Sequence, residues 1–224
     1  MNNFTQDQLK QLAAAKAVEF VPENEYIGIG TGSTVNFFIE ALGKSGKKIK
    51  GAVTTSLKSA ELMEQYEIPQ IQLNEVTRLG VYIDGADEIN HMMQMIKGGG
   101  AALLPEKIVA TLSDQFICIA DESKYVRKLG KFPLPVEVIP MARSMVARKI
   151  VKLGGQPELR IGCKTLHGNE ILDVHGLDLS EPMKMEDTLN RITGVVENGL
   201  FAHRYADLLI LAKKDGAEVI QAHV

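Results

Sequence analysis

The sequence lacks a long apolar segment, because no hydrophobic run in its 224 residues approaches the ~18 residues typical of a membrane helix. The chain begins with MNNFTQDQLK, which has no basic stretch followed by an apolar one, the pattern of a secretory signal. We therefore expect no membrane span and no secretory leader.

Cysteine and excess charge are also scarce. The chain has 2 cysteines, Cys118 and Cys163, which form no Cys-x-x-Cys pair, and Cys118 lies in the apolar run FICIA, typical of a core residue. The net charge is −3, and the basic stretch KSGKKIK is typical of a solvated loop. We therefore expect no nucleic-acid partner, and the cysteine usage fits a reducing cytoplasm.

Patterns that would hold a metal are missing as well. The 5 histidines show no ligand spacing, and no cysteine supports them. The acidic segment after Asp84 does not fit the Asp-x-Asp-x-Asp-Gly pattern of a calcium loop. No Ser-His-Asp arrangement can be recognised either, so metal-assisted and triad chemistry are disfavoured.

Strands and helices are predicted to alternate in the first half of the chain. Thr5 and Gln8 form a Thr-x-x-Gln capping box at the start of a first helix, and Ser56 is the predicted cap of the helix at 57–67. Short, mainly apolar segments predict strands at 25–30, 49–56, 71–76, 79–84 and 116–121, with helices at 35–42, 57–67 and from Pro105 onward. This order predicts a mostly parallel, Rossmann-like sheet with right-handed crossovers.

A different order of elements follows Phe132. Strands are predicted at 135–139, 158–162, 169–176 and 195–201, with helices at 141–155 and 182–194. The order β-α-β-β-α-β is that of the ferredoxin-like split unit. Residues 206–212 are apolar again and return to the first sheet. We therefore expect an α/β fold with a Rossmann-like domain (1–131 plus 202–224) and an inserted ferredoxin-like α+β domain (132–201).

The segment IGIGTGSTV places glycines and hydroxyls between a predicted strand and the start of a helix. Backbone N–H groups at such a junction can bind an anion, assisted by the helix dipole. A dinucleotide fingerprint fails, because Ser33 stands where its third glycine should be, and a P-loop fails for want of Gly-Lys-Ser/Thr. The remaining alternatives are a small-phosphate site and a tight turn capped by a hydroxyl.

A second polar cluster lies between Tyr82 and Lys107. Asp84 ends an apolar strand, and ligands gather at the carboxyl ends of strands in open α/β sheets. Lys97 precedes three glycines, which destabilise a loop unless a close approach requires them. Glu106 falls at a helix start, where the dipole stabilises a carboxylate. The alternatives are a solvated turn for the acids and a flexible linker for the glycine run. Lys124, which follows a further predicted strand, is either a ligand contact or a surface lysine.

Taken together, these motifs identify a resemblance. The motifs are GIGTGSTVNFFI, DGADEIN, MIKGGGAALLPEK, ICIADESK, GKFPLPVEVIPMA and GLFAHRYAD. In both the sequence and the order of these motifs, the chain resembles the type A ribose-5-phosphate isomerases over nearly its whole length. The resemblance implies interconversion of D-ribose 5-phosphate and D-ribulose 5-phosphate in the pentose phosphate pathway. It also implies no metal or organic cofactor, and a homodimer or a tetramer.

Site residues carry over by motif. The resemblance implies that Glu106 is the catalytic base, with Asp84, Asp87 and Lys97 as further catalytic groups. The substrate-binding residues that it implies are Thr31, Gly32, Ser33, Thr34, Asp84, Gly85, Ala86, Asp87, Lys97, Gly98, Gly99, Gly100 and Lys124.

The chemistry agrees with these residue types. Moving a carbonyl from C1 to C2 needs one base to transfer a proton across an enediolate, and Glu106 is the carboxylate best placed for it. Lys97 and the N–H groups of the glycine run suit the growing oxyanion. Rival readings are a sugar-phosphate sensor, an amino-sugar deaminase and a lactonase. The sensor would usually carry a helix-turn-helix, for which no segment precedes residue 25, and the DGADEI and KGGGAAL motifs favour the isomerase.

Overall fold

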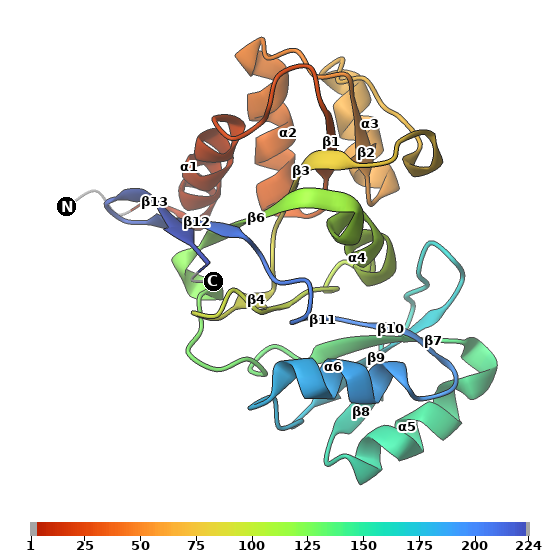
Figure 1. Cartoon of the computed structure of the whole chain (residues 1–224). Coiled ribbons are helices and arrows are strands. Elements are labelled where there is room, and N and C mark those ends of the chain that lie inside the picture. Colours follow the sequence, from red (N-terminus) through yellow and green to blue (C-terminus); the bar gives the residue numbers. More distant parts are fainter. Residues whose placement is uncertain (1–3, 223–224) are drawn as a thin grey trace. The chain divides into compact units, whose positions relative to one another are not determined.

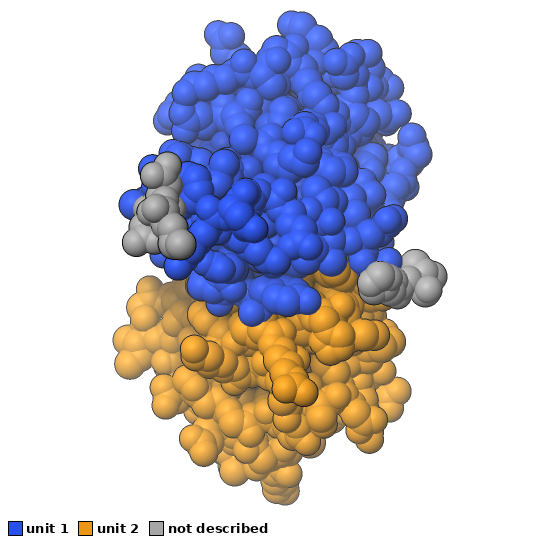
Figure 2. Space-filling model, turned by 90° about the vertical axis from the view of Figure 1, so that its left-hand side faces the viewer, with its two compact units in different colours: residues 1–86, 105–125, 206–224 blue, residues 87–104, 126–205 orange. Residues whose placement is uncertain are grey.

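The computed structural model describes residues 4–222, and Figure 1 shows their helices and strands. The chain forms two compact units, coloured separately in Figure 2. Unit 1 comprises the chain up to Ala86, Pro105–Tyr125 and the chain from Ala206, and unit 2 comprises Asp87–Leu104 and Val126–Tyr205. The domain boundaries that we expect from the sequence, near residues 132 and 201, stay a prediction.

Unit 1 contains the predicted sheet. Its strand order is β13-β12-β6-β3-β1-β2, and all neighbours are parallel except β12 and β13. The strands are β1 (Tyr26–Ile29), β2 (Gly51–Thr54), β3 (Leu79–Asp84), β6 (Ser113–Asp121), β12 (Leu208–Lys213) and β13 (Gly216–Gln221). The mostly parallel α/β sheet is therefore confirmed, and the stretch predicted at 206–212 joins it as β12.

Helices cover both faces of this sheet, because side chains alternate along each strand. Ile27 and Ile29 of β1 lie in a core that includes Phe38 of α2. Gly28, between them, faces α4: a Cβ atom there would lie 2.6 Å from Cγ1 of Val109. The helices are α1 (Gln6–Val18), α2 (Ser33–Ser45), α3 (Leu57–Gln65) and α4 (Leu103–Leu112).

The predicted capping residues begin their helices as expected. At α1, the N–H of Gln8 donates to Oγ1 of Thr5 (3.3 Å) and the N–H of Thr5 donates to Oε1 of Gln8 (2.8 Å). Ser56 caps α3 by accepting from the N–H of Ser59. These local bonds satisfy helix N–H groups that have no partner within the helix.

Unit 2 contains an antiparallel sheet of order β10-β7-β9-β8. Val136, Leu172, Val146, Ile150 and Leu189 contribute to the core of this unit. Its elements follow the predicted β-α-β-β-α-β order: β7 (Leu134–Val138), α5 (Arg143–Lys152), β8 (Gln156–Leu159), β9 (Glu170–His175), α6 (Pro182–Asn190) and β10 (Val195–Asn198).

Two expectations about strands are wrong. Residues 71–76 form the 3₁₀ turn η1 (Leu73–Glu75), and only Gln70 bridges to Ala52. Residues 195–201 are not one strand: at Gly199 the chain changes sheets, because its N–H donates to the carbonyl of Pro135 (2.8 Å) while its carbonyl accepts from the N–H of Lys97 (2.9 Å). The part after Gly199, β11 (Leu200–Phe201), pairs with β5 (Met95–Ile96), which pairs with β4 (Glu88–Ile89) in a separate small sheet.

Short 3₁₀ helices complete the description, η2 at Glu122–Lys124 and η3 at Pro140–Ala142. Among the described residues, no helix combines the length and the apolar composition needed to cross a bilayer.

Candidate active site

The loop after β1 lies where the strand order of unit 1 reverses. The chain leaves β1 for β2 on one side and later returns to β3 on the other, so the carboxyl ends of β1 and β3 form a topological switch point. Gly32 begins α2 with φ of +108°, a left-handed conformation that suits glycine. No side chain caps this described helix start, and N–H groups at such a position can bind an anion.

Hydroxyl groups hold this loop against the next one. The hydroxyl of Ser56 donates to Oγ1 of Thr31 (2.9 Å), and the hydroxyl of Ser59 donates to the carbonyl of Gly30 (2.9 Å). Ser33 is exposed and Thr34 is half-buried in the first turn of α2. The sequence motifs did not point to Ser56 and Ser59 as site residues, and the only signal for this pair was the predicted helix cap at Ser56.

Asp84, the last residue of β3, is fully buried and organises the same edge. Its Oδ1 accepts from the N–H of Thr31 (3.1 Å) and the N–H of Gly85 (2.7 Å). Its Oδ2 accepts from the phenol of Tyr82. A Cβ atom at Gly30 would lie 1.9 Å from Cγ of Asp84, so glycine is required there. The predicted phosphate loop and the predicted acid are thus in direct contact.

Glu106 lies in the first turn of α4 and is 3% exposed. The fully buried Tyr82 lies on the α4 side of the sheet, because a Cβ atom at Gly28 would lie 2.6 Å from Cγ1 of Val109 and 2.8 Å from Cδ2 of Tyr82. Burial, followed by the charges of Asp84 and Glu106, raises the pKa of Tyr82 well above its ordinary value. The sequence motifs did not point to Tyr82. Its position two residues before Asp84, on the same face of β3, was the available signal.

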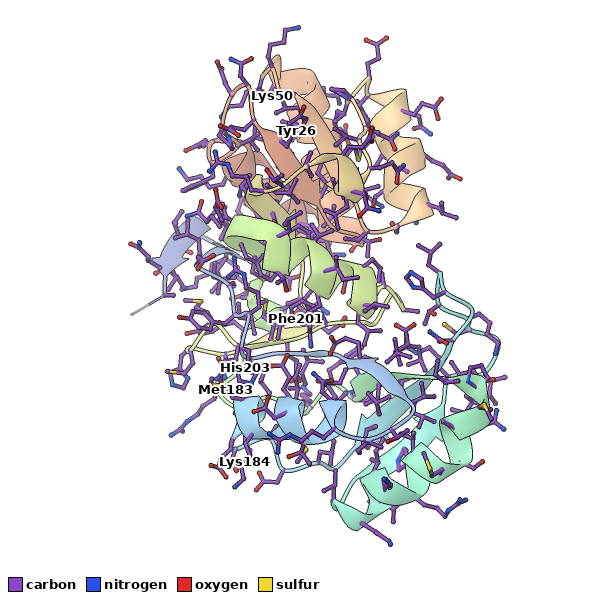
Figure 3. The ribbon with its side chains drawn as sticks, turned by 45° about the vertical axis from the view of Figure 1, so that its right-hand side comes forward. Tyr26, Lys50, Met183, Lys184, Phe201 and His203 are labelled. Carbon is purple, nitrogen blue, oxygen red and sulfur yellow. The ribbon has the colours of Figure 1, made fainter. Side chains whose placement is uncertain are left out.

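Unit 2 carries the other acid and the glycine run. Oδ2 of Asp87 accepts from the N–H of Gly99 (2.8 Å). Lys97 is 3% exposed, its N–H donates to the carbonyl of Gly199 (2.9 Å), and its Nζ lies 5.6 Å from the ring centroid of Phe201, which Figure 3 labels. Gly98 has φ of +101°. The run is therefore an ordered loop with specific bonds, unlike a flexible linker.

Lys124 ends the 3₁₀ helix η2, directly after β6 of unit 1. It is half-buried, and among the described residues it has no salt-bridge partner. The preceding Asp121 accepts bonds from the N–H and the hydroxyl of Ser123, which fixes the turn.

The predicted residues thus form two groups. Unit 1 holds the loop Thr31–Thr34, Asp84–Ala86, Glu106 and Lys124, and unit 2 holds Asp87 and Lys97–Gly100. The described part of the chain contains no group of three or more His, Cys, Asp or Glu side chains arranged to hold a metal ion.

Comparison with known proteins decides between the rival readings. A profile of the family "Ribose 5-phosphate isomerase A (phosphoriboisomerase A)" matches residues 51–216. The chain belongs to this family. The ribose-5-phosphate isomerase A of Neisseria meningitidis serogroup C (strain 053442) is 70% identical over 216 residues, which cover 96% of this chain and 97% of that protein.

Solved ribose 5-phosphate isomerase structures agree. The crystal structure of ribose 5-phosphate isomerase A from Neisseria gonorrhoeae is 68% identical, with a TM-score of 0.97 over 98% of this chain and 99% of the other. A D-ribose-5-phosphate isomerase solved in complex with phospho-erythronic acid is 36% identical, with a TM-score of 0.94 over 97% of this chain and 100% of the other. These matches support the isomerase over the sensor, deaminase and lactonase.

Proposed function

We propose that this chain interconverts D-ribose 5-phosphate and D-ribulose 5-phosphate through an enediolate, with Glu106 as the base. Family membership supports the reaction, which belongs to the pentose phosphate pathway. The observation that carries the role of Glu106 is its burial in the first turn of α4, close to Tyr82.

Glu106 removes the proton from C2 of the sugar and returns it to C1. A carboxylate on a helix has a fixed position, and its burial excludes water that would exchange with the transferred proton. A single base can serve both carbons because the enediolate is planar across them. A positioned base of this kind accelerates a reaction by about 10²- to 10⁴-fold.

The oxygen that becomes negative in this step needs donors that are already in place. We assign Lys97 and the N–H groups of Gly98 and Gly100 to this oxygen, because the N–H of Gly99 already donates to Asp87. The ammonium of Lys97 is buried beside the face of Phe201, where little water screens its charge. Preorganised donors in such surroundings stabilise a transition state more than they stabilise the neutral carbonyl.

The phosphate and the hydroxyl groups of the sugar orient the reacting carbons. The proposal places the phosphate on the loop Thr31–Thr34, where the first N–H groups of α2 and the side chain of Lys124 supply positive potential. Asp84 and Asp87, with the backbone of Gly85 and Ala86, bind hydroxyl groups and assist ring opening. Binding the phosphate end holds C1 and C2 beside the base.

A glutamine in place of Glu106 tests the base. We expect Glu106→Gln to lower kcat by at least about 10²-fold while ribose 5-phosphate still binds in calorimetry, because the amide keeps the shape of the side chain and cannot accept the proton. Glu122→Gln, which changes an exposed glutamate after β6, should keep wild-type activity. All assays contain EDTA, because the proposed mechanism uses no metal ion and should not be affected by a chelator. A Glu106→Gln enzyme that turns over near the wild-type rate would overturn the assignment.

Two further properties belong to this proposal. The family resemblance supports a homodimer or a tetramer, which sedimentation of the purified protein distinguishes from a monomer. It also supports a place in the cytoplasm, which fractionation of the source cells tests.

A further inference from the structure

Arg160 of unit 2 links the glycine run to the antiparallel sheet. It follows β8, and its own N–H donates to the carbonyl of Ile171 (2.9 Å), which extends the pairing with β9. Its guanidinium binds both carboxylate oxygens of Asp173, with 2.8 Å between Nε and Oδ2. Nη1 of the same group donates to the carbonyls of Gly98 (3.0 Å) and Gly99 (3.1 Å).

These two carbonyl bonds orient two peptide planes. In a trans peptide, the carbonyl of one residue and the N–H of the next point in opposite directions, and the chain has no cis peptide bond among its described residues. The carbonyls of Gly98 and Gly99 point at Arg160, so the N–H groups of Gly99 and Gly100 point away from it. The N–H of Gly99 meets Asp87, the other predicted site residue of this unit, at 2.8 Å.

We propose that Arg160 is a positioning residue of the isomerase, which fixes two peptide planes of the glycine run so that the N–H of Gly99 holds Asp87 and the N–H of Gly100 faces the substrate. The proposal rests on the proposed function, in which the N–H of Gly100 stabilises the oxyanion and Asp87 binds hydroxyl groups of the sugar. Arg160 touches neither substrate nor reacting atoms in this account. It acts through Gly98 and Gly99, while Asp173 holds the guanidinium in place.

The residue type suits the task. Arginine presents several N–H donors in one plane, so it can bind a carboxylate through two nitrogens while a third donates to two carbonyls. A lysine ammonium at this position could not keep both sets of bonds in the same geometry. The neighbouring glycines leave little freedom for another arrangement: Gly98 has φ of +101°, and a Cβ at Gly99 would lie 2.6 Å from Oδ1 of Asp87.

The test replaces the guanidinium and then supplies it from solution. We expect Arg160→Ala to lower kcat by about 10- to 100-fold, as removal or misplacement of a transition-state donor does. The KM should stay within about 3-fold, because the phosphate site in unit 1 is unchanged. Since the side chain is 19% exposed, millimolar methylguanidine should enter the gap and restore part of kcat, whereas methylammonium should not.

Arg143→Ala is the matched control. Arg143 also pairs with a carboxylate of the same sheet, Glu170 at 3.2 Å, and no bond from it to the glycine run is described. We expect wild-type kcat and no response to methylguanidine. If Arg160→Ala does not fold, Arg160→Lys carries the test, with a loss of kcat of about 3- to 10-fold at unchanged KM.

The possible results distinguish a failure of the Arg160 proposal from a failure of the proposed isomerase mechanism. Arg160→Ala with wild-type kcat, or with a loss that methylguanidine does not restore, would overturn the positioning role. A fall in melting temperature without a fall in kcat would likewise reduce Arg160 to a structural residue. An equal rate in wild type and Glu106→Gln would overturn the proposed mechanism instead, whatever Arg160→Ala does.

Discussion

The phenol of Tyr82 donates a hydrogen bond to the carboxylate of Asp84, and both side chains are fully buried in unit 1. They lie two residues apart on β3, so they share one face of the strand. The bond occupies Oδ2, while Oδ1 accepts from the N–H groups of Thr31 and Gly85. Tyr82 therefore fixes the rotation of a carboxylate that in turn fixes the start of the proposed phosphate loop.

Removing this phenol should affect both stability and catalysis. We expect Tyr82→Phe to lower the free energy of unfolding by about 1–3 kcal/mol, because a buried carboxylate oxygen loses a donor. We also expect kcat to fall, since Asp84 and the loop are then free to shift. Urea unfolding and steady-state assays measure the two effects.

Tyr26→Phe is the control for Tyr82→Phe. Tyr26 lies on β1 of the same sheet, and Nζ of Lys50 lies 5.7 Å from the centroid of its ring. Figure 3 labels both residues. Phenylalanine keeps a ring face for this cation. We expect little change in either measurement, and equal losses in both variants would count against a special role for Tyr82.

The stability that Tyr82 contributes should depend on pH. Burial and the charges of Asp84 and Glu106 raise its pKa, so the folded state binds the phenolic proton more tightly than the unfolded state does. The contribution is fully present below the ordinary tyrosine pKa of about 10, and it is lost as the pH rises from there toward the raised pKa. The gap in unfolding free energy between wild type and Tyr82→Phe should therefore be constant from about pH 7 to 9 and shrink above about pH 10. Urea titrations at several pH values measure the gap, and a gap that is still unchanged at about pH 11.5 would contradict the expectation.

Gly30→Ala should displace Asp84 without changing any charged group. The added Cβ would lie within 1.9–2.4 Å of the carboxyl atoms of Asp84, which is far too close for any contact. We expect a loss of kcat of about 10-fold or more, as misplacement of a site residue produces, together with lower stability. Gly80→Ala, on β3, is the control, because its nearest contact would be an ordinary 3.4 Å to Pro22. If Gly30→Ala changes kcat and stability as little as Gly80→Ala does, the observed position of Asp84 is not required for activity.

The sequence predicts elements whose signals lie within a short segment, and it does not predict elements that depend on residues far apart in the chain. Strands with several consecutive apolar residues, such as β3, and helices with side-chain caps, such as α3 at Ser56, carry local patterns and were predicted. β4, β5 and β11 have two residues each, which is too few to show a period. Apolar residues lie on both sides of Gly199, so the sequence did not show that the strand changes sheets there. Their pairing depends on contacts between distant parts of the chain.

The site shows the same division. Motifs pointed to Asp84 and Glu106, but not to Tyr82, because a tyrosine in an apolar strand also fits an ordinary core. Arg160 lies more than 60 positions from the glycines that it holds, and only the folded sheet brings them together. Residues that act on the substrate leave motifs, whereas residues that position them leave little local trace.

The core of unit 2 offers a test on neighbouring residues of α5. Ile150 is fully buried, and the adjacent Val151 is 58% exposed. Ile150→Ala should lower the free energy of unfolding by about 2–5 kcal/mol through lost burial and a cavity. Val151→Ala should change it by less than about 0.5 kcal/mol. Similar losses for both, measured by urea unfolding, would contradict the orientation of α5.

Glu88 follows Asp87 in the DGADE motif, and its acidic neighbourhood in the sequence allows a solvated turn. In the structure Glu88 is 3% exposed, and its carboxylate accepts from the N–H groups of Gly130 (2.7 Å) and Phe132 (2.6 Å). Both oxygens are needed, so Glu88→Gln should turn one acceptor into a donor facing a backbone N–H. We expect a loss of about 1–3 kcal/mol in unfolding free energy, since a buried group is left unsatisfied. Glu181→Gln, whose side chain is 69% exposed in a surface pair with Lys184, should cost less than about 0.5 kcal/mol. Thermal and urea unfolding of the two variants decide the point, because a solvated Glu88 would tolerate the amide as well as Glu181 does.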